Sequence, residues 1–294
     1  MRRRNLIGLL LLLALGAIRH LSASAGLDVP REKLHIYLLA GQSNMAGRGA
    51  VAEQDKLVHP RVFMLNRENK WLPAHEPMHF DKPAYVGVGP GLAFGKAMAE
   101  ADPNAIIGLV PCAVGGSPIS TWKHQAYHKQ TKSHPYDDAL KRGRIALQKG
   151  VLKGILWHQG EGDSNVQDGP LYEQRLTELI SNFRRELETP DLSFVAGMPA
   201  DAYVARVPAA RFVIDAIKAV AAADKNVYWV SAQGLACKAD RVHFNADSAR
   251  LLGRRYAEAV VKRKNITDPE PRTTEEQENR DNAPQGNSDN RKKR

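Results

Sequence analysis

Apolar and polar positions alternate in blocks along most of this chain. Apolar runs of buried-strand length occupy residues 34–40, 62–65, 106–111, 151–157, 192–198 and 227–231. Stretches with helical spacing lie among them, at residues 92–100, 137–149, 171–187 and 207–222, and a last one ends near residue 261. Strands that alternate with helices are typical of a mostly parallel sheet covered on both faces. The pattern therefore predicts an α/β fold, a three-layer α/β/α sandwich around a mostly parallel central sheet.

The two ends of the chain differ from this pattern. Residues 1–25 combine three early arginines, an apolar run over residues 6–18 and the small-residue sequence Ala23-Ser24-Ala25. These are the features of a secretory signal peptide, and the apolar run is short for a membrane-spanning helix. We expect cleavage and a secreted or periplasmic protein without stable membrane insertion; an uncleaved anchor is the alternative.

Residues 265–294 are rich in charged and amide side chains, with almost nothing to bury, so we expect a disordered tail. The domain predicted to fold is thus 26–264. The net charge is +10, and four of the arginines fall in the first 25 residues. The remaining positive charge is spread along the chain and could favour acidic glycans or envelope surfaces through long-range attraction. No basic helix with interleaved aromatic residues is present, so nucleic-acid binding is unsupported.

Three of the predicted strands end in polar or glycine-rich turns. Ser43 follows the first, Gly115 and Gly116 follow the strand at 106–111, and Gln159 follows the strand at 151–157. The carboxyl ends of parallel strands meet at one edge of a sheet, which is where open α/β proteins keep their binding sites. We therefore expect a hydroxyl group, flexible backbone amides and a side-chain amide at one edge.

An Asp-x-x-His sequence, Asp240 to His243, precedes the last helix, which Asn245 can cap. A serine hydroxyl needs a base within hydrogen-bond reach, and histidine can serve near neutral pH. A carboxylate that orients the imidazole and preformed N–H donors for the oxyanion complete the requirements of acyl transfer. Ser43, Asp240 and His243 supply the first three parts.

Four sequence blocks, in order, resemble the SGNH hydrolases, and most closely their sialate O-acetylesterase and carbohydrate esterase family 6 branch. The blocks are Gly41-Gln42-Ser43-Asn44-Met45-Ala46-Gly47, Cys112-Ala113-Val114-Gly115-Gly116-Ser117-Pro118-Ile119, Trp157-His158-Gln159-Gly160-Glu161 and Asp240-Arg241-Val242-His243-Phe244. The resemblance covers about residues 34–259. It implies the SGNH fold and a metal-independent serine esterase, without a cofactor, that removes O-acetyl groups from a carbohydrate.

The resemblance also implies roles for individual residues. Ser43 would be the nucleophile, His243 the base and Asp240 the orienting acid, while the Ser43 N–H, Gly116 and Gln159 would donate to the oxyanion. The choice between Gly115 and Gly116 stays open. Residues expected to contact substrate or support the site are Gln42, Asn44, Gly115 and Glu161. Glu161 could lie near the base, contact substrate or make a structural hydrogen bond.

Several alternatives remain at this stage. His124 and His128 have the spacing of metal ligands on a helix, but their loop is rich in lysine and a solvated role is favoured. Trp122 could stack on a sugar or anchor its loop. Cys112 and Cys237 could form a disulfide or remain buried thiols.

Function also leaves alternatives open. The acetylated partner could be hemicellulose of the xylan type, sialic acid or a related glycan. A glycan-binding module that has lost activity and a short-chain lipase or thioesterase are the competing functions. The oligomeric state is not decided by the sequence.

Overall fold

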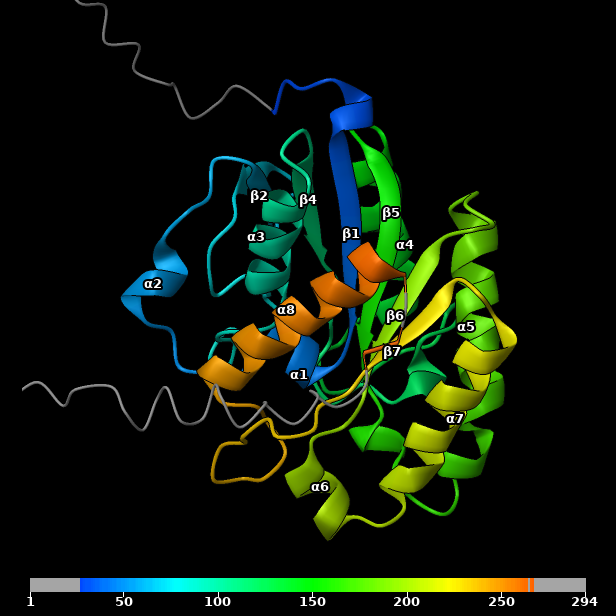
Figure 1. Ribbon diagram of the computed structural model, residues 1–294. Coiled ribbons are helices and arrows are strands. Elements are labelled where there is room, and N and C mark those ends of the chain that lie inside the picture. Colours follow the sequence, from blue (N-terminus) through cyan, green and yellow to red (C-terminus); the bar gives the residue numbers. More distant parts are fainter. Residues whose placement is uncertain (1–26, 264, 267–294) are drawn as a thin grey trace, which may run out of the picture.

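The structure is a computed structural model, and it describes residues 27–263, 265 and 266. A seven-stranded sheet forms its centre, with the strand order β3-β2-β4-β1-β5-β6-β7 (Figure 1). The strands are β1 (Leu34–Gly41), β2 (Val62–Leu65), β3 (Trp71–Pro73), β4 (Ile106–Pro111), β5 (Val151–His158), β6 (Ser193–Gly197) and β7 (Val227–Val230). All neighbours pair in parallel except β3, which runs antiparallel to β2 at the edge.

Helices cover both faces of this sheet. The α-helices are α1 (Ser43–Ala46), α2 (Glu53–Lys56), α3 (Gly91–Ala101), α4 (Pro135–Leu147), α5 (Tyr172–Glu186), α6 (Asp201–Arg206), α7 (Ala210–Ala223) and α8 (Ala246–Lys262). Short 3₁₀ turns lie at η1 (Arg31–Lys33), η2 (Ile119–Thr121), η3 (Glu161–Asp163) and η4 (Gly169–Leu171). The predicted three-layer fold is confirmed.

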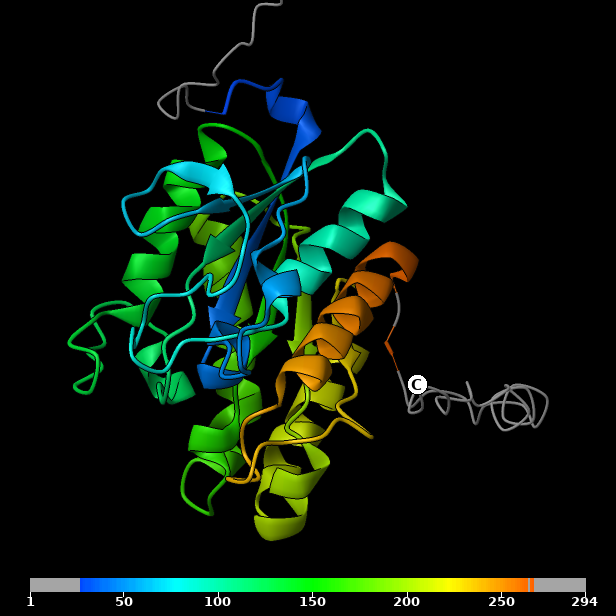
Figure 2. The same ribbon diagram turned by 90° about the vertical axis from the view of Figure 1, so that its left-hand side faces the viewer.

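The central strand β1 explains why the chain adopts this layering. Successive side chains of a strand point to opposite faces. Tyr37 and Leu39 therefore join the apolar core beneath α3 and α8, while Ile36 and Leu38 join the core beneath α4, α5 and α7. Figure 2 shows α3 and α8 together on one side of the sheet. A strand buried on both faces is expected to be largely apolar, and β1 is so except for the partly buried His35 near its start.

The sequence pattern missed four short elements. Strand β3 lies between the strand at 62–65 and the helix at 92–100, where the pattern predicted no element, and α1, α2 and α6 have no counterpart among the predicted helices. Each spans three to six residues. Such lengths are too short to display a helical or strand period, so tertiary contacts rather than local pattern select them.

The chain continues past α8 to the free edge of β7. Ile266 donates to the Trp229 carbonyl and accepts from the Ser231 N–H, both at 2.9 Å. The fold thus includes a residue that the sequence placed in the tail. The predicted signal peptide and the rest of the tail lie outside the described residues. Within the described part, every helix is too short or too polar to cross a membrane.

The two cysteines lie on opposite faces of the sheet. Cys112 is buried in the core beneath α4 and α5, whereas Cys237 packs against the core beneath α3 and α8. Both are free thiols. The disulfide that the sequence left open is therefore not formed in this structure.

Candidate active site

Ser43 stands at the carboxyl end of β1, where the chain turns into α1. Gly41 pairs with His158 of β5, and the Gln42 N–H donates to the His158 carbonyl at 2.8 Å. Gly41 has a φ of +122°, and a Cβ there would lie 2.2 Å from the His158 carbonyl oxygen. Only glycine fits this position, so the pairing of β1 with β5 fixes the position of Ser43. The Ser43 residue is 7% exposed.

His243 reaches Ser43 from the loop between β7 and α8. Its Nε2 lies 2.9 Å from the Ser43 Oγ, and its Nδ1 lies 2.9 Å from Asp240 Oδ2. An ionised carboxylate can only accept, so Nδ1 carries the proton in this pair. Nε2 then carries a free lone pair that accepts a hydrogen bond from the serine hydroxyl, which is the arrangement a general base requires.

Asp240 holds both the turn and the imidazole. Its Oδ1 accepts from the backbone N–H groups of Val242 and His243, at 2.8 and 2.9 Å. Desolvation by partial burial would raise the pKa of Asp240, but these hydrogen bonds and the imidazole outweigh it and lower the pKa to about 2. The carboxylate is therefore ionised at any pH at which histidine can act as a base.

In the loop after β4, the two candidate glycines differ in the bonding of their backbone N–H groups. The Gly115 N–H donates to Asp81 Oδ2 at 2.7 Å, whereas the Gly116 N–H has no acceptor among the described residues. Gly116 has a φ of +80°. Asp81 also binds Arg48 at 2.8 Å, and both side chains are buried. Of the two glycines left open by the sequence, Gly116 is thus the one whose N–H is available.

Gln159 is fully buried, and its amide is already bonded. Its Nε2 donates to Asp163 at 2.5 Å and lies 3.3 Å from both the Gln42 side-chain oxygen and the Ser117 carbonyl. One N–H is therefore tied firmly to Asp163, while the other is shared between two long contacts. Asp163 in turn accepts from the Ile119 N–H at 2.9 Å, and burial raises the pKa of its carboxyl group.

Glu161 does not contact the imidazole of His243. Its carboxylate accepts from the Gln42 amide at 2.8 Å and from the Asn44 amide at 2.5 Å. The side chain is 5% exposed, and burial raises the pKa of Glu161. Of the three possibilities that the sequence left open, the structural hydrogen bond is the one that the geometry shows. Asp240 is the carboxylate beside the base.

The structure brings all nine predicted site residues to one edge of the sheet. It also adds residues that the sequence did not point to. Arg48, Asp81 and Asp163 fix the backbone loops, but each bonds a partner at least four residues away and belongs to none of the four blocks. The one sequence signal for these residues is a charged side chain in a stretch that is otherwise apolar or rich in glycine.

The remaining candidates of the sequence have structural roles. His124 binds Asp137 and His128 binds Thr131, at 2.9 and 2.8 Å. Trp122 is 2% exposed, so its ring anchors the loop and does not offer a face to a sugar. In the part of the chain that the structure describes, no three His, Cys, Asp or Glu side chains gather as a metal site would require.

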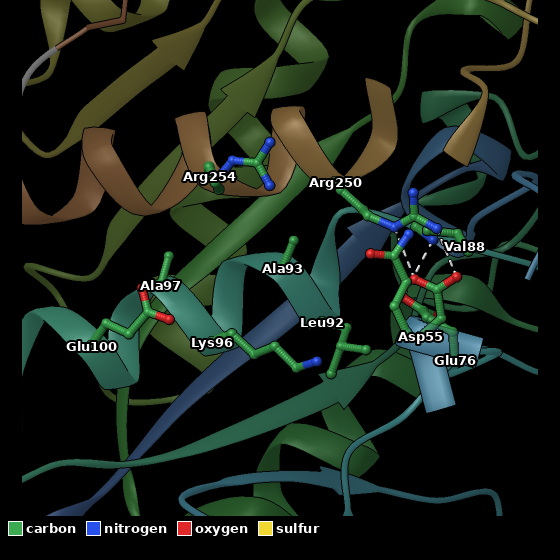
Figure 3. Close-up of a pocket in the computed structure, with 12 residues that line it drawn as sticks. Asp55, Glu76, Val88, Leu92, Ala93, Lys96, Ala97, Glu100, Arg250 and Arg254 are labelled. Carbon is green, nitrogen blue, oxygen red and sulfur yellow. Dashed lines mark hydrogen bonds and ion pairs between the residues drawn. The ribbon is translucent and has the colours of Figure 1, made fainter. Parts of the chain in front are cut away.

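A separate pocket of about 240 Å³ lies between α2, α3 and α8 (Figure 3). At one end of it Arg250 makes two hydrogen bonds to the buried carboxylate of Asp55, at 2.9 and 2.7 Å. Next to this pair, Glu76 accepts from the Met78 and Gly89 N–H groups, and burial raises the pKa of Glu76 to about 8. The pair ties α2 to α8, the helix that begins three residues after His243.

A serine, a histidine and an aspartate that are linked by hydrogen bonds at the carboxyl ends of the strands of this sheet define the class of SGNH-type ester hydrolases. The chain belongs, within that class, to the family described as carbohydrate esterase, sialic acid-specific acetylesterase, whose model matches residues 33–262. It is accordingly a carboxylic ester hydrolase, and the family resemblance stated from the sequence is confirmed.

Relatives agree with this placement. A probable carbohydrate esterase of Arabidopsis thaliana is 34% identical over 249 residues, which cover 77% of this chain and 90% of the relative. The crystal structure of that protein matches with a TM-score of 0.66 and 31% identity, over 78% of this chain and 98% of the other.

Two more distant structures share the fold. NanS matches with a TM-score of 0.65 and 20% identity, over 80% of this chain and 98% of its own. A carbohydrate acetylesterase from Xanthomonas citri matches with a TM-score of 0.60 and 19% identity, over 77% of this chain and 56% of its own.

Proposed function

We propose that the protein removes O-acetyl groups from a carbohydrate through an acetyl-enzyme on Ser43. The observation that carries this proposal is the continuous chain from Ser43 through His243 to Asp240, with 2.9 Å at each step. Membership of a carbohydrate acetylesterase family supports the choice of ester.

In the first half-reaction the Ser43 Oγ attacks the acetyl carbonyl carbon while His243 Nε2 takes the hydroxyl proton. The carbonyl oxygen becomes an oxyanion, which the Ser43 N–H and the Gly116 N–H stabilise. Gln159 adds a third donor through the N–H that is otherwise shared between two long contacts. The C–O bond to the sugar then breaks, and the sugar oxygen takes the proton from His243.

In the second half-reaction water attacks the acetyl carbonyl. His243 accepts a proton from the water, the same donors stabilise the second oxyanion, and acetate leaves as Ser43 regains its proton. Asp240 keeps Nδ1 as the donor of the imidazole in both steps. None of these steps calls on a metal ion.

Acetate release tests this proposal. Purified protein is assayed with p-nitrophenyl acetate, butyrate and octanoate, acetylated xylan and O-acetyl sialic acid, with and without EDTA. We expect release from acetyl esters that is insensitive to EDTA and abolished by Ser43→Ala. The matched control is Ser120→Ala, at a half-buried serine on η2 whose side chain makes no hydrogen bond to the residues that the structure describes.

The outcomes separate the competing functions. Preference for octanoate would favour a lipase or thioesterase. Binding of a glycan without any acetate release, by protein shown to be folded, would favour a binding module. Release that survives Ser43→Ala would contradict the assignment of the nucleophile. Among active polymers, the one with the highest kcat/KM identifies the glycan.

We further propose that the protein is exported with cleavage after Ala25. The three early arginines, the apolar run and the small-residue site support this. Expression with a carboxyl-terminal tag, followed by amino-terminal sequencing of the exported protein, tests it. A chain that begins at Gly26 is expected. A chain that keeps Met1 and sediments with membranes would instead indicate an anchor.

A further inference from the structure

One buried amide bridges the two residues on either side of His243. The Asn44 Nδ2 donates to the Val242 carbonyl at 3.0 Å, and the Asn44 Oδ1 accepts from the Phe244 N–H at 3.1 Å. Asn44 is 3% exposed and directly follows Ser43. The nucleophile and the backbone that carries the base are therefore joined by a side chain one residue from the nucleophile.

Glu161 fixes which way this amide points. Its Oε1 accepts the second hydrogen of the Asn44 Nδ2 at 2.5 Å, while its Oε2 accepts from Gln42 at 2.8 Å. A carboxylate accepts only, so the nitrogen of the Asn44 amide must face it. The oxygen is then left to face Phe244. Every hydrogen-bonding group of the Asn44 amide has a partner.

The base needs such a support because its own loop is exposed. The side chains of His243 and Asp240 are 26% and 42% exposed, and Arg241 between them adopts a left-handed φ of +58°. Asp240 orients the imidazole, but its hydrogen bonds to described residues all lie within the turn, with Val242 and His243. The bond that Asn44 donates to Val242 and the bond that it accepts from Phe244 fix the distance between this turn and Ser43.

We propose that Asn44, oriented by Glu161, is a positioning residue that sets His243 Nε2 at hydrogen-bond distance from Ser43 Oγ. This inference rests on the proposed function, and it adds that the pair acts through the imidazole rather than on substrate. Two carboxylates therefore position His243. Asp240 binds the imidazole ring, and Glu161 acts through Asn44 on the backbone beside His243.

The main test is Asn44→Ala, assayed on p-nitrophenyl acetate and on the best polymer. A displacement of about 1 Å of a catalytic group can reduce the rate about 100-fold. We expect kcat to fall roughly 10- to 100-fold while KM changes less than about twofold. Asn226→Ala is the control, since Asn226 is also a buried, bonded amide but lies at the opposite edge of the sheet, before β7.

A double-mutant cycle distinguishes positioning from general structural support. If Asn44 acts through the imidazole, Asn44→Ala has no further effect on the residual rate of a His243→Ala protein. A role in the oxyanion site or in the fold would lower that residual rate again. Additive losses in the two variants would thus overturn the proposal.

Glu161 provides an independent test if the Asn44 variant does not fold. Glu161→Ala removes the acceptor of the amide, and we expect a fall in kcat of about 10-fold. Glu161→Gln keeps an oxygen for Asn44 and is expected to recover most of the rate. Equal loss in both variants would contradict the orienting role. If the wild-type protein releases no acetate, or Ser43→Ala keeps its rate, the proposed function fails before this inference is reached.

Discussion

The two halves of the candidate active site are built in different ways. Ser43 follows the central strand, which is buried except at His35, and is itself 7% exposed. The Asp240 and His243 side chains instead lie on a loop and are 42% and 26% exposed. Backbone pairing between β1 and β5 places the nucleophile. The base is placed by side-chain hydrogen bonds of Asn44 and Asp240, together with an isolated backbone bridge between Cys237 and Phe244. The sheet therefore determines one partner rigidly, while the other depends on a few polar contacts that single substitutions can remove.

We expect the largest effect from His243→Ala, which should abolish activity without destabilising the fold. Loss of the base lowers kcat by about 10⁴-fold or more in comparable serine hydrolases. Because the side chain is partly exposed on a loop, the melting temperature should change little. Activity is measured by acetate release and stability by thermal unfolding. A large loss of stability would mean that the loop is part of the core structure after all.

Asp240→Asn is expected to be the next largest effect, a loss of about 10²- to 10⁴-fold in kcat, since the amide favours the wrong tautomer of His243. The folded pKa of Asp240, about 2, is below its unfolded value, so the carboxylate stabilises the fold above about pH 4. That contribution is lost as the pH falls from about 4 towards 2. Urea unfolding at pH 3 and pH 7 should show a smaller difference for Asp240→Asn than for the wild type.

Gly41→Ala addresses the rigid half and, unlike His243→Ala, should destabilise the fold. A Cβ at 2.2 Å from the His158 carbonyl oxygen, at a φ of +122°, has to displace the end of β1. Strain and overpacking predict a loss of roughly 2–5 kcal/mol in the free energy of unfolding, together with activity. The control is Gly234→Ala, where φ is +72° but nothing lies within 4 Å, so about 1 kcal/mol is expected. Similar values for the two variants would exclude the steric explanation.

The smallest effect concerns His158, whose backbone carries the pairing with Gly41. Burial lowers the pKa of His158 to about 3, against about 6.5 in the unfolded chain. Between these values the unfolded chain binds a proton that the native protein does not, so stability rises as the pH increases across this range. His158→Leu should reduce this slope between pH 4 and 6 in urea unfolding. The remaining slope should come from His79, whose pKa burial lowers to about 4.

The sequence predicted the rigid half better than the loop half. Strands β1 and β5 are mostly apolar, with His35, Lys153 and His158 as the exceptions. The turns that follow them carry Ser43 and Gln159, so the pattern alone located both. The contacts of Asn44 with Val242 and Phe244 join positions about 200 residues apart. The periodicity of apolar residues within a helix or strand cannot predict a contact between positions so far apart.

Glu161 illustrates the same limit. Its type and position allowed it to serve as an acid beside the base, a substrate ligand or a structural acceptor. Only the three-dimensional arrangement shows that its two oxygens are taken by Gln42 and Asn44. Asp81 was missed because its partner, the Gly115 N–H, belongs to the backbone and leaves no trace in residue types.

The short pairing of Ile266 with β7 has a consequence for solubility. An uncovered edge strand offers unpaired N–H and C=O groups to any other strand that meets it, which promotes aggregation. The bonds of Ile266 to Trp229 and Ser231 occupy that edge with the protein's own chain. A protein shortened to residue 263 would expose the edge of β7, and we expect it to self-associate at concentrations at which the full chain stays dispersed.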